Sequence, residues 1–297
     1  MFSLTEFADY FKEKFMKIAI TADSSIDLTP ELKQKYGVIT VPVNITLGDE
    51  EILDGVMTNE EMFAWVEKNK ILPKTSAINA FTFQEFFEKV LKDYDKIIHI
   101  SLSGDISSMY SNAVAASKEF GDRVEVIDSR VLTSAMGLLA IYARKLIDGG
   151  NEDIRDVAEK VRARIPFVQA SFVIERLDYL YKGGRCSSLA LLGANVLKLR
   201  PQIVLKNGKM VSAKKYRGKM PQVIKNYCQD VFAEFNHPDK EVCFITASSA
   251  TPEMFEEAKK AAQEQGFKNV YVTTAGMTVA SHCGANTLGV LYMNDGE

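Results

Sequence analysis

The stretch HISLSGDISSMYSNA, residues 99–113, follows an apolar run and leads into a helical segment. The apolar run, residues 97–102, is typical of a buried strand. The turn after it contains Gly104 and several serines, and residues 113–120 have the composition of a helix. The order strand, turn, helix indicates an open α/β sheet, in which ligands bind beyond the carboxyl ends of the strands.

The hydroxyl-rich turn has two explanations. Backbone N–H groups at a helix start favour an anion, and Ser103 and Ser107 would add hydroxyl donors, which predicts a carboxylate or phosphate site. The commoner alternative is an ordinary connection whose serines cap the helix. The stretch alone leaves both explanations open.

Two further strands of the N-terminal half end in polar residues. Residues 17–22 and 123–127 are apolar and alternate with helical segments, as in a parallel sheet. They end in Asp23-Ser24-Ser25 and Asp128-Ser129. Because parallel strands end at the same edge, we expect one rim rich in serine and aspartate. Asp23 and Asp128 are candidate active-site acids, although aspartate after a strand is more often a turn residue.

The pattern changes after Pro166. Strand-like and helical segments continue. Residues 201–205 and 210–213 are predicted to form a hairpin, because Asn207-Gly208 between them favours a tight turn. This half is predicted to be α+β with a mixed or antiparallel sheet. The expected parts are a helical extension at residues 1–16, a parallel-sheet α/β domain at 17–165 and an α+β domain at 166–297.

Composition narrows the function. The chain has 297 residues, of which 46% are hydrophobic and 25% are charged. Its net charge of -3 lacks the positive excess that is typical of nucleic-acid-binding proteins. Four scattered cysteines without a C-x-x-C pair or signal peptide indicate reduced thiols in the cytoplasm. No apolar run reaches transmembrane length, and three histidines make a metal site unexpected. The dinucleotide, P-loop, zinc-protease and nucleophile-elbow motifs are absent.

A series of short motifs runs from about residue 16 to the end of the chain. They are residues 20–25 (ITADSS), 41–43 (VPV), 54–55 (DG), 74–76 (KTS), 102–110 (LSGDISSMY), 126–129 (VIDS), 183–185 (GGR), 200–201 (RP), Arg217 and 282–284 (HCG). Each is weak alone, but in this order they are specific. The chain resembles the DegV family, which includes the FakB-type, fatty-acid-binding subunit of bacterial fatty acid kinase.

The resemblance implies a long-chain fatty acid as ligand, without a cofactor. Thr75, in what we interpret as a short hydroxyl turn, and Ser103 would bind its carboxylate at the domain junction, with His282 beside them. The acyl chain would lie in an apolar tunnel. Arg185, Arg200 and Arg217 match basic positions of the family. The resemblance implies that some of these arginines contact the kinase or support the residues that bind the carboxylate.

The resemblance also implies a carrier without catalytic activity of its own. It would present the carboxylate to a separate ATP-dependent fatty acid kinase and carry the acyl-phosphate, with at most transient membrane contact. Burial of roughly fourteen methylenes contributes on the order of 11 kcal/mol, against about 4–15 kcal/mol for association. Neutral hydroxyls then suffice for orientation, and they leave the carboxylate more nucleophilic than a bidentate arginine would.

The sequence departs from the family pattern at three places. Gly104 replaces a frequent second serine, Ser108-Met109 a frequent Gly-Thr, and Ala285-Asn286 a frequent Pro-Gly. These changes leave the preferred chain length and headgroup open.

Two other functions compete with the carrier. One is a hydrolase for a lipid-like ester, with Ser103 as nucleophile, His282 as base and Asp23 or Asp128 as its orienting acid. The other is a regulatory protein whose lipid is structural.

Overall fold

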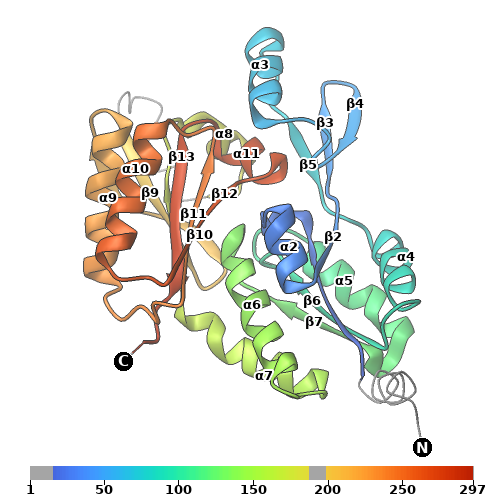
Figure 1. The fold of residues 1–297 in the computed structure, drawn as a ribbon. Coiled ribbons are helices and arrows are strands. Elements are labelled where there is room, and N and C mark those ends of the chain that lie inside the picture. The colour runs from blue at the N-terminus through green and yellow to red at the C-terminus, as the bar shows by residue number, and fades with distance from the viewer. Residues whose placement is uncertain (1–15, 187–198, 297) are drawn as a thin grey trace, which may run out of the picture.

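The computed structural model describes residues 16–186 and 199–296, whose strands form three sheets (Figure 1). The N-terminal sheet is entirely parallel, which confirms the predicted α/β fold. All six residues of β1 (Ile18–Asp23) are buried, as expected for an inner strand of a parallel sheet. The strand order is β2 (Val38–Val41), β1 (Ile18–Asp23), β6 (Lys96–Ser101), β7 (Val124–Asp128).

Helices alternate with these strands along the chain, as the sequence predicts. The rim also forms as expected, because Asp23 Oδ2 accepts from Leu102 N at 2.8 Å and Ser129 N donates to Ser101 O at 3.1 Å. The helices of this half are η1 (Ser24–Ile26), α2 (Pro30–Tyr36), α4 (Ala80–Val90), α5 (Met109–Ser117), η2 (Lys118–Arg123), α6 (Ser134–Asp148), α7 (Ile154–Arg164) and η3 (Ile165–Phe167).

A small antiparallel sheet projects from this half (Figure 1). It consists of β4 (Glu50–Leu53), β3 (Asn44–Leu47) and β5 (Lys74–Ser76), with α3 (Asn59–Asn69) between β4 and β5 in the chain. Residues 74–76 therefore form a strand, where the sequence indicated a turn. The sheet packs on α11 (Met277–Cys283) from the other end of the chain, through a cluster that includes Ile45, Met62 and Ala280.

The C-terminal sheet is mixed, as predicted, because β11 and β12 are parallel and the other neighbours are antiparallel. The Asn207-Gly208 hairpin forms between β9 and β10. The strand order is β10 (Lys209–Arg217), β9 (Leu199–Lys206), β8 (Val168–Val173), β13 (Thr287–Met293), β11 (Val242–Ser248), β12 (Asn269–Thr274). The other helices of this half are α8 (Leu177–Gly183), α9 (Met220–Glu234) and α10 (Pro252–Glu264).

Helix α6 lies between the parallel and the mixed sheet and contacts strands of both (Figure 1). Nine of its fifteen residues are buried, which explains its mostly apolar sequence. We propose a domain boundary near Ile165, because the strands of the first two sheets precede it and those of the third follow it. The helix predicted for residues 1–16 lies outside the described residues, apart from Met16. None of the helices in the described ranges is long and apolar enough to cross a membrane.

Candidate functional site

A cavity of about 180 Å³ lies where the three sheets meet. Its wall combines β5, the turn between β6 and α5, the region after α8, the start of β10 and helix α11. The lining is mainly apolar, with hydroxyls and one histidine. The lining residues are Ser25, Val43, Thr75, Ser76, Ala77, Leu102, Ile106, Ser107, Ser108, Met109, Leu132, Arg185, Met210, Thr278, Val279, His282 and Cys283.

Thr75 and His282 form a hydrogen-bonded pair in this wall. Thr75 Oγ1 lies 2.8 Å from His282 Nε2, although 207 positions separate the two residues in the chain. Strand β5 supplies the threonine and α11 supplies the histidine, so packing of the small sheet on α11 brings them together. The structure thus places two of the three predicted carboxylate ligands side by side on one cavity.

The environment of His282 keeps its imidazole neutral. Burial, and secondarily the positive charge of Arg185, lower the pKa of His282 from 6.5 to about 4. Its Nδ1 is buried without a hydrogen-bond partner in the described part of the chain, and it faces Gly183 at the end of α8. An unpaired lone pair costs less than an unpaired N–H, so we assign the proton to Nε2, which donates to Thr75 Oγ1.

This assignment predicts the titration of His282. In the ligand-free protein, the chemical shift of the His282 Cε1–H signal should change with a midpoint near pH 4 in an NMR pH series. An H282N variant identifies the signal. The pKa of His282 is lower in the folded than in the unfolded protein, so protonation favours the unfolded state. The contribution of the neutral imidazole to the free energy of unfolding is therefore complete above pH 6.5 and decreases as the pH drops toward 4. A midpoint near 6.5 would contradict the buried, neutral imidazole.

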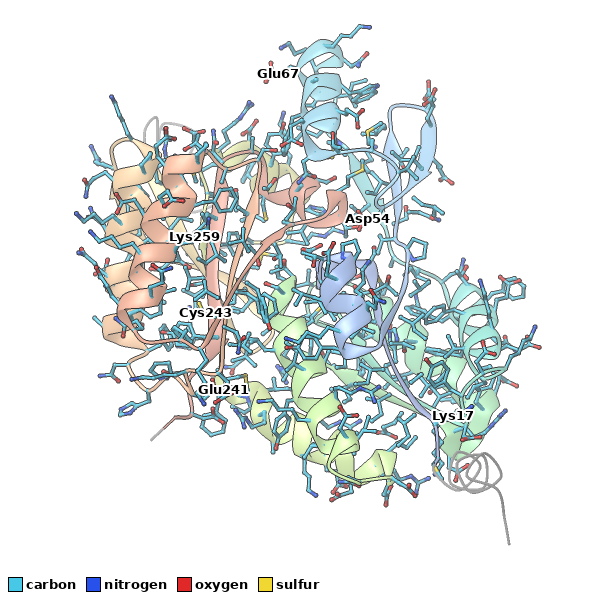
Figure 2. The ribbon with its side chains drawn as sticks, viewed as in Figure 1. Lys17, Asp54, Glu67, Glu241, Cys243 and Lys259 are labelled. Atoms are coloured by element: carbon cyan, nitrogen blue, oxygen red, sulfur yellow. The ribbon has the colours of Figure 1, made fainter. Side chains whose placement is uncertain are left out.

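Two other hydroxyls in the wall, those of Ser25 and Thr278, are already engaged. Ser25 Oγ donates to Asp23, whose pKa is raised chiefly by burial. Thr278 Oγ1 donates to Asp54 at 2.7 Å, where the small sheet meets α11 (Figure 2). Sequence reasoning did not single out Ser25 or Thr278 as lining residues. Ser25 sits in the Asp-Ser-Ser turn, which gave a signal, whereas Thr278 had none.

Ser103 lies outside the cavity wall. Its side chain is fully buried, and its hydroxyl donates to the carbonyl of Gly208 at 2.7 Å. Its backbone N–H donates to Val131 O at 3.1 Å, so both donors of Ser103 connect the rim to neighbouring segments. Ser107 and Ser108, further along the same turn, line the cavity instead.

The three predicted arginines lie in different places. Arg185 lines the cavity, is exposed, and donates from Nη1 to Gly183 O at 2.6 Å. Arg200 is half-buried and binds the backbone and carboxylate of Glu175. Arg217 is exposed at the end of β10, where it pairs with Leu199 of β9, and its side chain makes no hydrogen bond or ion pair with another described residue. The structure therefore brings only Arg185 to the cavity.

A second, narrower cavity of about 20 Å³ continues the first one inward. Leu132, Val279 and Cys283 line both cavities, so these three side chains form their common wall. The inner cavity lies against the mixed sheet and is lined largely by apolar residues from β8, β13 and α11, such as Phe172 and Leu291. The polar pair thus stands in the outer cavity, and an apolar path leads from it into the core.

Comparison with known proteins identifies the family. The sequence model described as "Uncharacterised protein, DegV family" matches residues 17–295. The chain belongs to the DegV family. A DegV domain-containing protein of Caldanaerobacter subterraneus is 29% identical, over 93% of this chain and 98% of that protein. A protein of Thermotoga maritima named "Fatty acid-binding protein" is 30% identical, over 68% of this chain and 72% of its own length.

A solved DegV structure has the same fold. The structure from Thermus thermophilus, described as "Fatty Acid Binding of a DegV family Protein", superposes with a TM-score of 0.86. The alignment covers 94% of this chain and 100% of that chain at 23% sequence identity.

The structure shows what surrounds the three places where this DegV protein departs from the family pattern. Ser108 and Met109 both line the outer cavity. A side chain at Gly104 would start 3.1 Å from Asp128 Oδ2 and 3.2 Å from the Tyr110 ring, so a serine there would need its neighbours to move. Asn286 has a left-handed backbone, with φ of 55°, and its side chain donates to Glu175. Only the change at residues 108–109 alters the cavity wall directly.

In this DegV protein, the residues of the hydrolase hypothesis are not arranged as a catalytic triad. Ser103 Oγ is bonded to Gly208 O, and His282 Nε2 is bonded to Thr75. No carboxylate of the described residues accepts a hydrogen bond from His282 Nδ1. Asp23 is bonded to Ser25 and Leu102, and Asp128 accepts from the backbone of Gly104 and Arg130, as expected of turn residues.

Proposed function

We propose that this protein binds a long-chain fatty acid, with the carboxylate at Thr75 and the acyl chain along the two cavities. The observation that carries the proposal is the Thr75–His282 pair at an apolar cavity that continues into the core. The Thermotoga maritima relative named as a fatty acid-binding protein supports it.

The pair suits a carboxylate without neutralising it. When His282 Nε2 donates to Thr75 Oγ1, the threonine hydroxyl keeps its own hydrogen for an oxygen of the ligand. The nearby charge of Arg185 favours the anionic ligand without the bidentate geometry that would occupy both of its oxygens. The carboxylate therefore keeps a lone pair that can attack a phosphoryl group.

The apolar path supplies the binding energy. Leu132, Val279 and Cys283 connect the two cavities, so a chain that starts at Thr75 passes them on its way to the mixed sheet. Burial of roughly fourteen methylenes is worth on the order of 11 kcal/mol, similar to the cost of association. Short fatty acids should therefore bind far more weakly than long ones.

The proposed carrier hands the carboxylate to a separate ATP-dependent kinase. The sequence has no P-loop, so ATP and Mg²⁺ would come with that partner. The acyl-phosphate formed would leave on this chain in the cytoplasm. Arg217 is exposed and unpaired within the described residues, as a contact to a partner requires, whereas Arg200 is bound to Glu175. With this chain alone, ATP should give no acyl-phosphate, and a product without the kinase would refute the carrier.

The proposal is tested by Thr75→Ala with Thr75→Ser as its matched control. Loss of a hydrogen bond to a charged group costs about 1.5–3 kcal/mol, so Thr75→Ala should weaken palmitate binding by roughly tenfold or more. Thr75→Ser keeps the hydroxyl and should bind nearly as the parent does. Binding is measured by calorimetry. Mass spectrometry of the native protein, followed by denaturation and lipid extraction, identifies any fatty acid that co-purifies.

Equal palmitate affinity in both variants and the parent would remove Thr75 from the headgroup site. No co-purifying lipid, together with no uptake of added fatty acids, would overturn the proposed function itself.

A further inference from the structure

The tip of the β9–β10 hairpin is fastened to the rim of the parallel sheet. Ser103 Oγ donates to Gly208 O at 2.7 Å, and Arg130 Nη2 donates to Asn207 O at 2.8 Å. The carboxylate of Asp105 lies 3.7 Å from Lys209 Nζ and 3.5 Å from Arg130 Nη2. Two turns of the N-terminal half thus bind the tip of a C-terminal hairpin. We call these contacts the clasp.

The tip fits the rim only as a glycine. Gly208 is buried and has a φ of 83°, a conformation that side-chain-bearing residues rarely adopt. A Cβ there would lie 2.7 Å from Asp105 Oδ2 and 3.0 Å from Ser103 Oγ. The Asn-Gly turn therefore forms the hairpin and also lets the rim approach its backbone.

The clasp sets the position of a cavity-lining residue. Met210 follows Gly208 by two positions and is the second residue of β10. Met210 is 5% exposed and lines the outer cavity opposite Ile106 and Ser107, which belong to the same turn as Ser103. When the clasp holds Gly208, it also holds Met210 in the cavity wall.

The hairpin can move without breaking the middle of the sheet. Among the strands of residues 16–186 and 199–296, β10 lies at the edge of the mixed sheet and pairs with β9 only. Pairing of β9 with β8 extends to Val204, so Leu205 and the tip project beyond it. The pairing of β10 with β9 is irregular between Ser212 and Lys215, and such a bulge bends a strand. The segment from the bulge to the tip is therefore held by β9, by the clasp and by a hydrogen bond from Cys186 Sγ to Met210 O at 3.4 Å.

We propose that this hairpin tip closes the cavity, that Ser103 and Arg130 hold it closed, and that its opening sets the rate at which a fatty acid enters and leaves. Ser103 is then a positioning residue, which acts on the cavity through Gly208 and Met210. The identity of the ligand rests on the proposed function, whereas the mobility of the tip does not.

Ser103→Ala and Arg130→Asn each remove a hydrogen bond of the clasp and therefore test it. Asparagine is chosen at residue 130 because it tolerates the left-handed backbone of Arg130. Stopped-flow fluorescence with cis-parinaric acid measures both rate constants. We expect association and dissociation each to rise by about fivefold or more, with a much smaller change in Kd. Lys206→Ala removes an exposed lysine of the hairpin that is not part of the clasp, and it should change neither rate.

The pattern of rates separates the clasp from a headgroup role. If Ser103 bound the carboxylate, Ser103→Ala would raise the dissociation rate and Kd and leave association unchanged, as expected for Thr75→Ala. That outcome, or unchanged rates in both clasp variants, overturns the proposal.

Hydrogen–deuterium exchange of residues 205–212 tests the clasp without any ligand. Exchange should be faster in both clasp variants and unchanged in Lys206→Ala, with equal melting temperatures to show that the variants fold. If the parent does not take up the probe, the proposed function fails, yet faster exchange still supports the clasp. Unchanged exchange in folded Ser103→Ala and Arg130→Asn overturns the clasp, whatever the probe does.

Discussion

Val279→Trp should abolish tight binding of long fatty acids while short ones still bind. Val279 lies on α11, is half-buried and lines both the outer and the inner cavity. An indole at this position fills the passage that Leu132 and Cys283 share with it. The outer cavity, with Thr75 and His282, remains available to a carboxylate with a short chain.

The size of the effect follows from the methylenes that lose their site. If the tryptophan blocks the passage and about four methylenes of the chain lose their buried position, the loss is about 3 kcal/mol, or about 200-fold in palmitate affinity. Octanoate does not need the inner cavity, so its weak affinity should change by less than about threefold. Competition against a fluorescent fatty acid measures both ligands in one assay.

Val56→Trp is the matched control for this substitution. Val56 is 65% exposed and lines neither cavity, so the same added indole should leave both affinities unchanged. Extra volume in a packed region costs about 1–3 kcal/mol of stability, and thermal unfolding shows whether Val279→Trp remains folded. A folded Val279→Trp protein that binds palmitate as tightly as the parent would place the acyl chain elsewhere.

Local sequence signals predicted the elements of this fold. The continuous apolar run of residues 97–102 gave the buried strand β6, and Asn207-Gly208 gave the hairpin. Both signals lie within a few residues of what they predict. Residues 74–76 carried no such signal, because three residues are too few for periodicity, and their strand exists through pairing with β3.

The contacts of the candidate site are long-range, and local signals could not predict them. The Thr75–His282 pair spans 207 positions, and only the resemblance to the DegV family placed the two residues together. Ser103 differs from this pair. Its hydroxyl-rich turn left a ligand contact and an ordinary connection open, and the resemblance implied the ligand contact, which stays a prediction. In the structure its hydroxyl is bonded to the carbonyl of Gly208, 105 positions away. A sequence pattern identified the donors but could not tell which acceptor each one meets.

Gly183→Ala should weaken fatty acid binding although residue 183 has no side chain to contact the ligand. Gly183 ends α8, and a Cβ on it would overlap His282 Nδ1. The imidazole must then move away from α8 and from its 2.8 Å contact with Thr75 Oγ1. We expect palmitate affinity to fall by roughly tenfold, because the Thr75 hydroxyl loses the hydrogen bond from His282 that orients its own hydrogen toward the ligand.

A double-mutant cycle shows whether Gly183 acts through His282. If the overlap with the imidazole is the cause, Gly183→Ala should have no further effect on affinity once His282→Ala has removed the ring. Additive losses would mean that the end of α8 affects the ligand by another route.

Gly184→Ala serves as control, because a Cβ there meets open space but the φ of 69° strains any other residue. It should lower stability by about 1 kcal/mol and leave affinity unchanged. The two adjacent glycines would then be needed for different reasons: Gly183 for the space that the imidazole occupies, and Gly184 for the left-handed backbone that ends the helix.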